Sequence, residues 1–186
     1  APPHHVAHPF AVVVALGAVM ALQTTSFAII LPLLSLRLTH MGAGVDALSL
    51  SLVAFAVAAT LSAPLMGALA DRYGRRPLVL GPLLVYTLAF AGYGLAPSAW
   101  VFILLRGLAG ALTAGLMPAA TGIVADLAPP ARRAQWIGIL TGGMSAGWMI
   151  GPTLGGLLYD RWGMTVPFAT AVGLAALTLF LALLIV

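Results

Sequence analysis

Six long apolar stretches take up most of the chain, and the charged residues gather almost entirely between them. A helix of about 20 mostly apolar residues is long enough to cross the apolar core of a bilayer. Continuous apolar runs are typical of such helices, whereas the strands of a membrane β-barrel alternate between apolar and polar residues. We therefore predict an all-α membrane protein with six transmembrane helices. The predicted helices cover residues 10–36, 47–70, 77–96, 99–124, 135–158 and 164–186.

The composition supports lipid as the medium around these helices. Of the 186 residues, 62% are hydrophobic and only 6% are charged, whereas about a quarter of the residues in a soluble domain are charged. The net charge of +4 comes from arginines that lie between apolar runs. This pattern differs from a basic cluster on a soluble fold and argues against nucleic-acid binding. The chain has no cysteine, which excludes disulfide and thiolate chemistry within it.

We predict no cofactor and no metal site. A group of three histidines near the start resembles a metal-binding cluster only weakly. It consists of His4, His5 and His8. These residues lie in a proline-rich segment, residues 1–9, which we interpret as a cytoplasmic N-terminal tail before a helical bundle of residues 10–186.

The arginines between the apolar runs predict the orientation in the membrane, because cytoplasmic loops are enriched in Arg and Lys. Counted on alternate sides, five loop arginines lie on one side and two on the other. The larger set is Arg72, Arg75, Arg76, Arg132 and Arg133, and the smaller set is Arg37 and Arg161. We therefore expect the larger set in the cytoplasm, together with both ends of this multi-pass protein of the cell (inner) membrane.

Two segments that lie three spans apart share a pattern. Residues 64–74 read PLMGALADRYG and residues 152–163 read PTLGGLLYDRWG, so each begins with P-x-x-G and ends with Asp-Arg-aromatic-Gly. An odd number of spans separates the two copies, which places them on opposite sides of the membrane. An inverted repeat of three plus three helices requires this arrangement, and such repeats build many secondary transporters.

A charged motif follows the second apolar stretch, where residues 67–76 read GALADRYGRR. Gly67, near the helix end, would let a neighbouring helix approach closely. Gly74 permits the positive φ that a tight turn often needs. The carboxylate of Asp71 can pair with Arg75 or meet the positive end of another helix.

This segment resembles the loop motif of the major facilitator superfamily, G-x-L-A-D-R-x-G-R-R, at every fixed position. The resemblance implies one six-helix half of a twelve-helix transporter, in which the motif acts as a latch between conformations. The latch residues would be Gly67, Asp71, Arg72, Gly74, Arg75 and Arg76. For Arg72 and Arg76 an alternative stays open, in which they only set the topology and bind anionic lipid headgroups.

Glycine recurs at every fourth residue along part of the fifth apolar stretch, at Gly143, Gly147, Gly151 and Gly155. In a helix these residues form a stripe without side chains, at which another helix can pack closely. Pro152 removes one intrahelical hydrogen bond and favours a kink.

The same stretch resembles the antiporter motif of drug exporters in this superfamily, G-x8-G-x3-G-P-x2-G-G. The resemblance implies export rather than uptake, although close helix packing alone also accounts for the glycines. The matching residues are Gly138, Gly147, Gly151, Pro152, Gly155 and Gly156.

Arg106 is the only charged residue well inside a predicted span. Because a charge at the centre of a membrane helix is costly, we expect its side chain to face the bundle interior and to have a partner. The alternative is that the side chain snorkels to the interface. Arg106 and Gly110 resemble part of the fourth-span motif of the superfamily, with Ala109 in place of the usual Gln. The resemblance implies a role for Arg106 in proton coupling.

A second charge, Asp126, follows the fourth span. We interpret it as a helix cap or a topological charge. The alternative is a gate charge that pairs with Arg132 and Arg133.

Polar residues of the first span, with neighbours in the first and fifth spans, are candidates to line a solute cavity. The candidates are Gln23, Thr24, Ser26, Phe27, Met144 and Trp148. Many members of the superfamily carry an acid at the position that corresponds to Gln23. Since no Asp or Glu lies inside a span of this chain, proton coupling would require an acid in another part of the protein.

These patterns predict a secondary active transporter, and not an enzyme, that exports small apolar or drug-like solutes by alternating access. Because the chain starts at Ala1 and stops at Val186 within an apolar run, we expect a fragment of a longer protein. Its partners would be the solute, the lipid bilayer, a C-terminal six-helix half and, with an acid in that half, protons. The alternatives are an uptake carrier for a small metabolite, for instance an anion paired to Arg106, and a six-span membrane protein that moves no solute.

Overall fold

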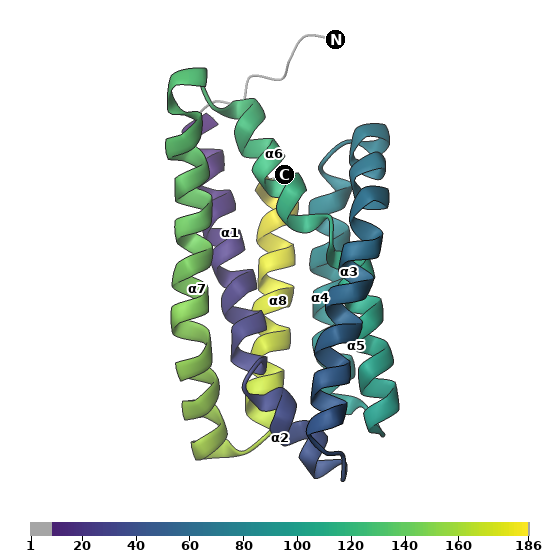
Figure 1. Ribbon diagram of the computed structural model, residues 1–186. Coiled ribbons are helices and arrows are strands. Elements are labelled where there is room, and N and C mark those ends of the chain that lie inside the picture. Colours follow the sequence, from purple (N-terminus) through teal and green to yellow (C-terminus); the bar gives the residue numbers. More distant parts are fainter. Residues whose placement is uncertain (1–8, 186) are drawn as a thin grey trace.

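The computed structural model describes residues 9–185, so the three histidines of the predicted tail lie outside the described residues. Figure 1 shows a bundle of long helices that run up and down side by side, and no β-strand occurs in the described part of the chain. This all-α architecture confirms the predicted fold class. The helices are α1 (Pro9–Ile30), α2 (Leu33–His40), α3 (Val45–Tyr73), α4 (Pro77–Leu95), α5 (Ala99–Thr113), α6 (Leu116–Leu127), the short 3₁₀ helix η1 (Pro130–Arg132), α7 (Arg133–Trp162) and α8 (Thr165–Ile185).

Within residues 9–185, five segments are long and apolar enough to cross a membrane. They are α1 with α2, α3, α4, α5 with α6, and α8. The sixth predicted span corresponds to α7, whose 30 residues are also long enough. Its seven glycines and terminal charges make it less apolar than the other five. The chain is thus a multi-pass membrane protein, and each predicted apolar stretch forms a helical segment.

Two spans that the sequence predicted as continuous are broken in the structure. The first is divided at residues 31–32, between α1 and α2, and the fourth is divided at residues 114–115, between α5 and α6. Proline has no N–H group, so Pro32 and Pro118 each leave the carbonyl four residues earlier without its helical hydrogen bond. The break in the fourth span matters for function because it borders a cavity described below.

Two predicted connections are shorter than expected, because α3 and α7 each continue for another turn. The Asp-Arg pairs at residues 71–72 and 160–161 therefore lie in final helical turns and not in loops. Each helix is followed by a glycine with positive φ, Gly74 at 82° and Gly163 at 75°. Glycine adopts this conformation without the steric cost that a Cβ brings. The positive φ predicted for Gly74 is confirmed.

Three of the most extensive helix pairings follow the predicted inverted repeat, and α8 also packs against α1 about as extensively as against α4. α1 lies along α7, α3 lies along α5, and α4 lies along α8 (Figure 1). Exchanging spans one, two and three with spans four, five and six turns the α1–α7 pair into the α5–α3 pair. The same exchange turns the α4–α8 pair into itself. The tertiary contacts therefore have the symmetry of a three-plus-three repeat.

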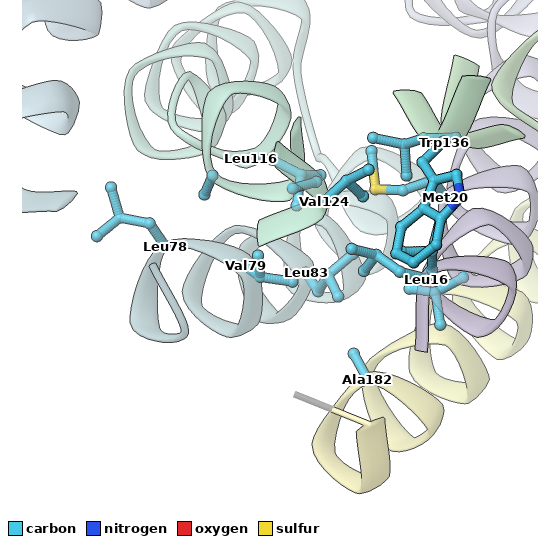
Figure 2. Close-up of a cluster of buried hydrophobic side chains, with 14 of the residues drawn as sticks. Leu16, Met20, Leu78, Val79, Leu83, Leu116, Val124, Trp136 and Ala182 are labelled. Atoms are coloured by element: carbon cyan, nitrogen blue, oxygen red, sulfur yellow. The ribbon is translucent and has the colours of Figure 1, made fainter. Parts of the chain in front are cut away.

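Two clusters of buried apolar side chains hold the ends of the bundle together. At one end α1, α4, α6, α7 and α8 meet, and Figure 2 shows Leu16, Met20 and Trp136 of this cluster next to one another. At the other end α1, α2, α4, α5 and α8 surround Phe90 and Phe102. Because lipid tails are as apolar as these side chains, close van der Waals packing is the main force that joins such helices.

Much of the apolar surface has no partner within the described residues. The most apolar part of α3 contains no buried residue. Between residues 50 and 65 of α3, the large exposed side chains are Leu50, Leu52, Val53, Val57, Leu61 and Leu65. The start of α1 and the end of α8 lie at the same end of the bundle, beside α6 (Figure 1), as an even number of spans requires.

Candidate functional site

A cavity of about 240 Å³ lies between the two buried clusters, where α1, α3, α4, α7 and the break between α5 and α6 meet. Most of the residues that the sequence suggested as cavity-lining do border this space. They are Gln23, Thr24, Phe27, Met144 and Trp148. Ser26 does not, because its hydroxyl donates a hydrogen bond of 2.6 Å to the carbonyl of Ala171. The expectation for Ser26 was wrong, since this side chain joins α1 to α8.

Aromatic rings form much of the cavity wall. Phe27 of α1 is at their centre, with ring centroids 5.7 Å from Trp148, 6.0 Å from Tyr86 and 6.1 Å from Phe55. The rings of Trp148 and Tyr86 stand edge-on to Phe27, a geometry that aromatic pairs favour. The sequence analysis did not single out Phe55 and Tyr86, because a lone aromatic residue in an apolar span carries no signal that separates a cavity wall from ordinary packing.

Arg106 of α5 is buried beside this wall with 2% of its surface exposed. Its Cζ atom lies 4.6 Å from the ring centroid of Phe55 and 5.8 Å from the centroids of Phe27 and Tyr93. Among residues 9–185 no carboxylate pairs with Arg106. Its interior position agrees with the first expectation and contradicts snorkelling. Its charge is offset by cation–π contacts with aromatic rings.

A second group of functional candidates, the charged corner, lies where α3, α4 and α6 end or begin. It consists of Asp71, Arg72, Arg75, Arg76 and Asp126. Most of these residues border a hollow of about 610 Å³. Arg75 pairs with Asp126, with 2.5 Å between Nη1 and Oδ2. The ion pair suggested between Asp71 and Arg75 is therefore not formed, and Asp126 pairs neither with Arg132 nor with Arg133.

Glycines around the charged corner have different surroundings. A Cβ added at Gly67 would meet nothing within 4 Å in the described chain, so the close helix approach expected there is absent from this part of the protein. A Cβ at Gly122 of α6 would come within 2.6 Å of the Cζ atom of Arg75. Gly122 therefore makes room for Arg75. The signal that could have found it is its place one helical turn before Asp126.

The glycine stripe of α7 packs directly against α1. A Cβ added at Gly143 or Gly147 would come within 2.6 Å of a backbone carbonyl oxygen, that of Gly17 or of Ala21. An added Cβ at Gly155 would clash with the carbonyl oxygen of Ile29, and one at Gly151 would clash with the Cβ of Ala28, so the predicted close crossing is confirmed. Added Cβ atoms at the two outer motif residues, Gly138 and Gly156, would meet nothing within 4 Å. α7 runs through Pro152 as one helix.

Comparisons with known proteins agree with this architecture. The family model described as "Major Facilitator Superfamily" matches residues 15–186. The chain is 35% identical to "Multi-drug resistance efflux pump PmrA homolog" of Lactococcus lactis subsp. lactis over 161 residues, which cover 84% of this chain and 40% of that relative. It is 35% identical to "Multidrug resistance protein MdtG" of Klebsiella pneumoniae over 165 residues, which cover 86% of this chain and 40% of that relative.

A solved structure shows the same fold. The crystal structure of the human organic anion transporter MFSD10 superimposes with a TM-score of 0.79 at 28% sequence identity, over 94% of this chain and 47% of that chain. The chain thus spans less than half the length of each of these relatives. The family match reaches all six helical segments and, of these, leaves out only the start of α1. The chain therefore belongs to the major facilitator superfamily of membrane transporters, as an N-terminal six-helix half that resembles multidrug exporters.

Proposed function

We propose that this chain is half of a secondary active transporter that exports small, apolar or drug-like solutes across the cell (inner) membrane. The observation that carries the proposal is the cavity with aromatic walls, to which four helical spans and the α5–α6 break contribute. Ligand sites for apolar molecules are concave, mostly apolar and have few polar groups. The relatives called multidrug resistance proteins and efflux pumps support the same class of solute.

The transport cycle would be alternating access between two six-helix halves. The exposed apolar faces of α3 and α7 offer surface for a C-terminal half, and the cavity would open toward it. Rocking of the halves would expose the solute to each side in turn. The charged corner, with the ends of α1 and α8, would lie in the cytoplasm and act as the latch that stabilises one state.

Proton coupling would need an acid outside this chain, because the four aspartates lie at helix ends. Arg106 would take part through its charge. Protonation of a nearby carboxylate in the other half would change how strongly that half is attracted to this one. The energy of the proton gradient would then bias the two conformations.

A second candidate function is the uptake of a small anionic metabolite. It is favoured by the lack of a carboxylate partner for Arg106 among residues 9–185 and by the structural likeness to an organic anion transporter. Against it, the pocket that Arg106 borders leaves no room for a water molecule, so an anion reaches the guanidinium only after the surrounding rings move.

Efflux measurements test the proposal and separate it from uptake. Cells that produce the full-length protein are loaded with an apolar fluorescent dye, and its loss is followed after energisation. We expect faster loss than in cells without the protein. Trp148→Ala should slow efflux because it removes part of the cavity wall, whereas Trp100→Ala, at an exposed site near the start of α5, should not. Accumulation of a labelled organic anion without dye efflux would favour the second candidate.

A further inference from the structure

Gln23 is a buried polar side chain whose hydrogen-bonding groups have no protein partner. Only 3% of its surface is exposed, and neither Nε2 nor Oε1 finds a partner within the described chain. Its neighbours differ. Thr24 donates to the carbonyl of Met20, Thr25 donates to that of Ala21, and Ser26 reaches Ala171. Since buried amides are normally paired, the amide of Gln23 stands out in this polar run, and a ligand reaches its two atoms only after the side chain or its neighbours move, because less than 1 Å² of each atom is exposed.

Among the described residues, Gln23 is one of those that line the cavity with aromatic walls. Gln23 borders it together with Phe27, which lies one helical turn further along α1, and with Tyr86 and Trp148. Flat aromatic rings that surround one amide form a site for a flat ligand with a polar edge. The rings would stack on the ligand, and the amide would form hydrogen bonds with its polar edge.

The charges around the cavity disfavour a cationic ligand. The described lining contains no carboxylate, and the positive charge of Arg106 lies against Phe27 and Phe55, two of the rings that border the cavity. Each of these rings already has the guanidinium over one face. From the described residues, a positively charged ligand would therefore meet repulsion from Arg106 and no acid to offset it, since charges interact strongly where water is excluded.

We propose that Gln23 is a specificity-determining residue that selects uncharged aromatic ligands with a hydrogen-bond donor beside an acceptor, as in a lactam or carboxamide. Oε1 accepts from the N–H group of the ligand, and Nε2 donates to its carbonyl oxygen. Both orphan atoms of the side chain are then satisfied at once. This inference rests on the proposed function, because it names the solute class of the same cavity.

Three compounds of nearly equal size and shape test the proposal by their affinity for the purified full-length protein. Quinolin-2-one has a donor beside an acceptor, N-methylquinolin-2-one has lost the donor, and N-methylquinolinium is a cation. We expect the lactam to bind about tenfold more tightly than its N-methyl derivative, as the loss of one buried hydrogen bond implies. The cation should bind most weakly. Equal affinities for all three compounds would overturn the proposal.

Variants assign the preference to one side chain. Gln23→Met keeps the length of the side chain and should remove the advantage of the lactam. Gln135→Met, at an exposed site in the first turn of α7, is the matched control and should preserve it. If the lactam preference survives in Gln23→Met, the amide of Gln23 in the parent protein would bind only water and not the ligand. The proposal would then be wrong.

A second variant keeps the test decisive if Gln23→Met does not fold. Gln23→Glu keeps the shape, loses the donor and adds a carboxylate, so the lactam should lose affinity and the quinolinium should gain it. Unchanged affinities would overturn the proposal. Dye efflux by the parent protein is measured in parallel. Efflux without a lactam preference would reject only the role of Gln23, whereas the absence of both efflux and binding would count against the proposed function as well.

Discussion

The guanidinium of Arg75 lies directly against Gly122, in the space that the Cβ of any other residue would occupy, with only 2.6 Å between that Cβ and Cζ. From there Arg75 reaches Asp126, one turn further along α6. The side chains of Arg75 and Asp126 are 38% and 67% exposed, and such solvated pairs contribute only about 0–1 kcal/mol to stability. The effect of this contact is therefore expected on the balance between conformations rather than on folding.

Gly122→Ala tests this relationship. The new methyl group should push the flexible end of Arg75 away from Asp126 and slow transport severalfold, with little change in thermal stability. In a double-mutant cycle, Gly122→Ala and Asp126→Asn should be non-additive, because both remove the same ion pair. Gly173→Ala of α8, where an added Cβ meets nothing within 4 Å, is the control. Full additivity of the two changes would contradict the role assigned to Gly122.

Gly147→Ala tests the crossing of α1 and α7. The added Cβ would lie 2.6 Å from the carbonyl oxygen of Ala21, and since backbone cannot move aside as a side chain does, the two helices must separate. Overpacking of this kind costs about 1–3 kcal/mol, so the melting temperature of the detergent-solubilised protein should fall. Gly156→Ala, at an open site of the same helix, should leave it unchanged or raise it. Equal melting temperatures for both variants would show that the crossing is not tight.

Arg106→Ala tests the buried charge. We expect normal membrane insertion and loss of driven transport, because Phe27, Phe55 and Tyr93 would lose the cation that they surround. Arg106→Lys keeps a cation that rings can hold and should retain part of the rate. Arg133→Ala, at an exposed site, is the control, and transport is measured in energised vesicles. A parental rate in Arg106→Ala would remove Arg106 from the mechanism.

Labelling of single cysteines tests the proposed orientation, and the lack of native cysteine in this chain keeps the background low. Tyr73→Cys introduces a thiol at an exposed site of the charged corner, and Thr39→Cys introduces one at an exposed site of α2, at the opposite end of the bundle. A membrane-impermeant maleimide should label Thr39→Cys in intact cells and should label Tyr73→Cys only after permeabilisation. The reverse pattern would place the charged corner outside the cell.

Much of the fold could be predicted from the sequence, because its signals are local or periodic. An apolar stretch either is or is not long enough to cross a bilayer, and glycines at every fourth residue share one face of a helix wherever that helix lies. The six helical segments, the inverted repeat and the glycine stripe of α7 therefore followed without knowledge of any distance. The breaks near Pro32 and Pro118 were missed, although proline chemistry accounts for them.

The tertiary structure alone decided which side chains meet. By charge or position, Arg75 could pair with Asp71, with Asp126 or with the α6 backbone. It pairs with Asp126 because of how α4 and α6 lie beside each other. In the same way, packing turned Ser26 toward α8 and left Gln23 beside the cavity with its amide unpaired among the described residues, although both belong to one polar run. The sequence by itself determined which segments are helices in lipid, because that depends on each segment's own residues. The partners of each polar group depend on distances between segments far apart in the chain, which only helix packing sets.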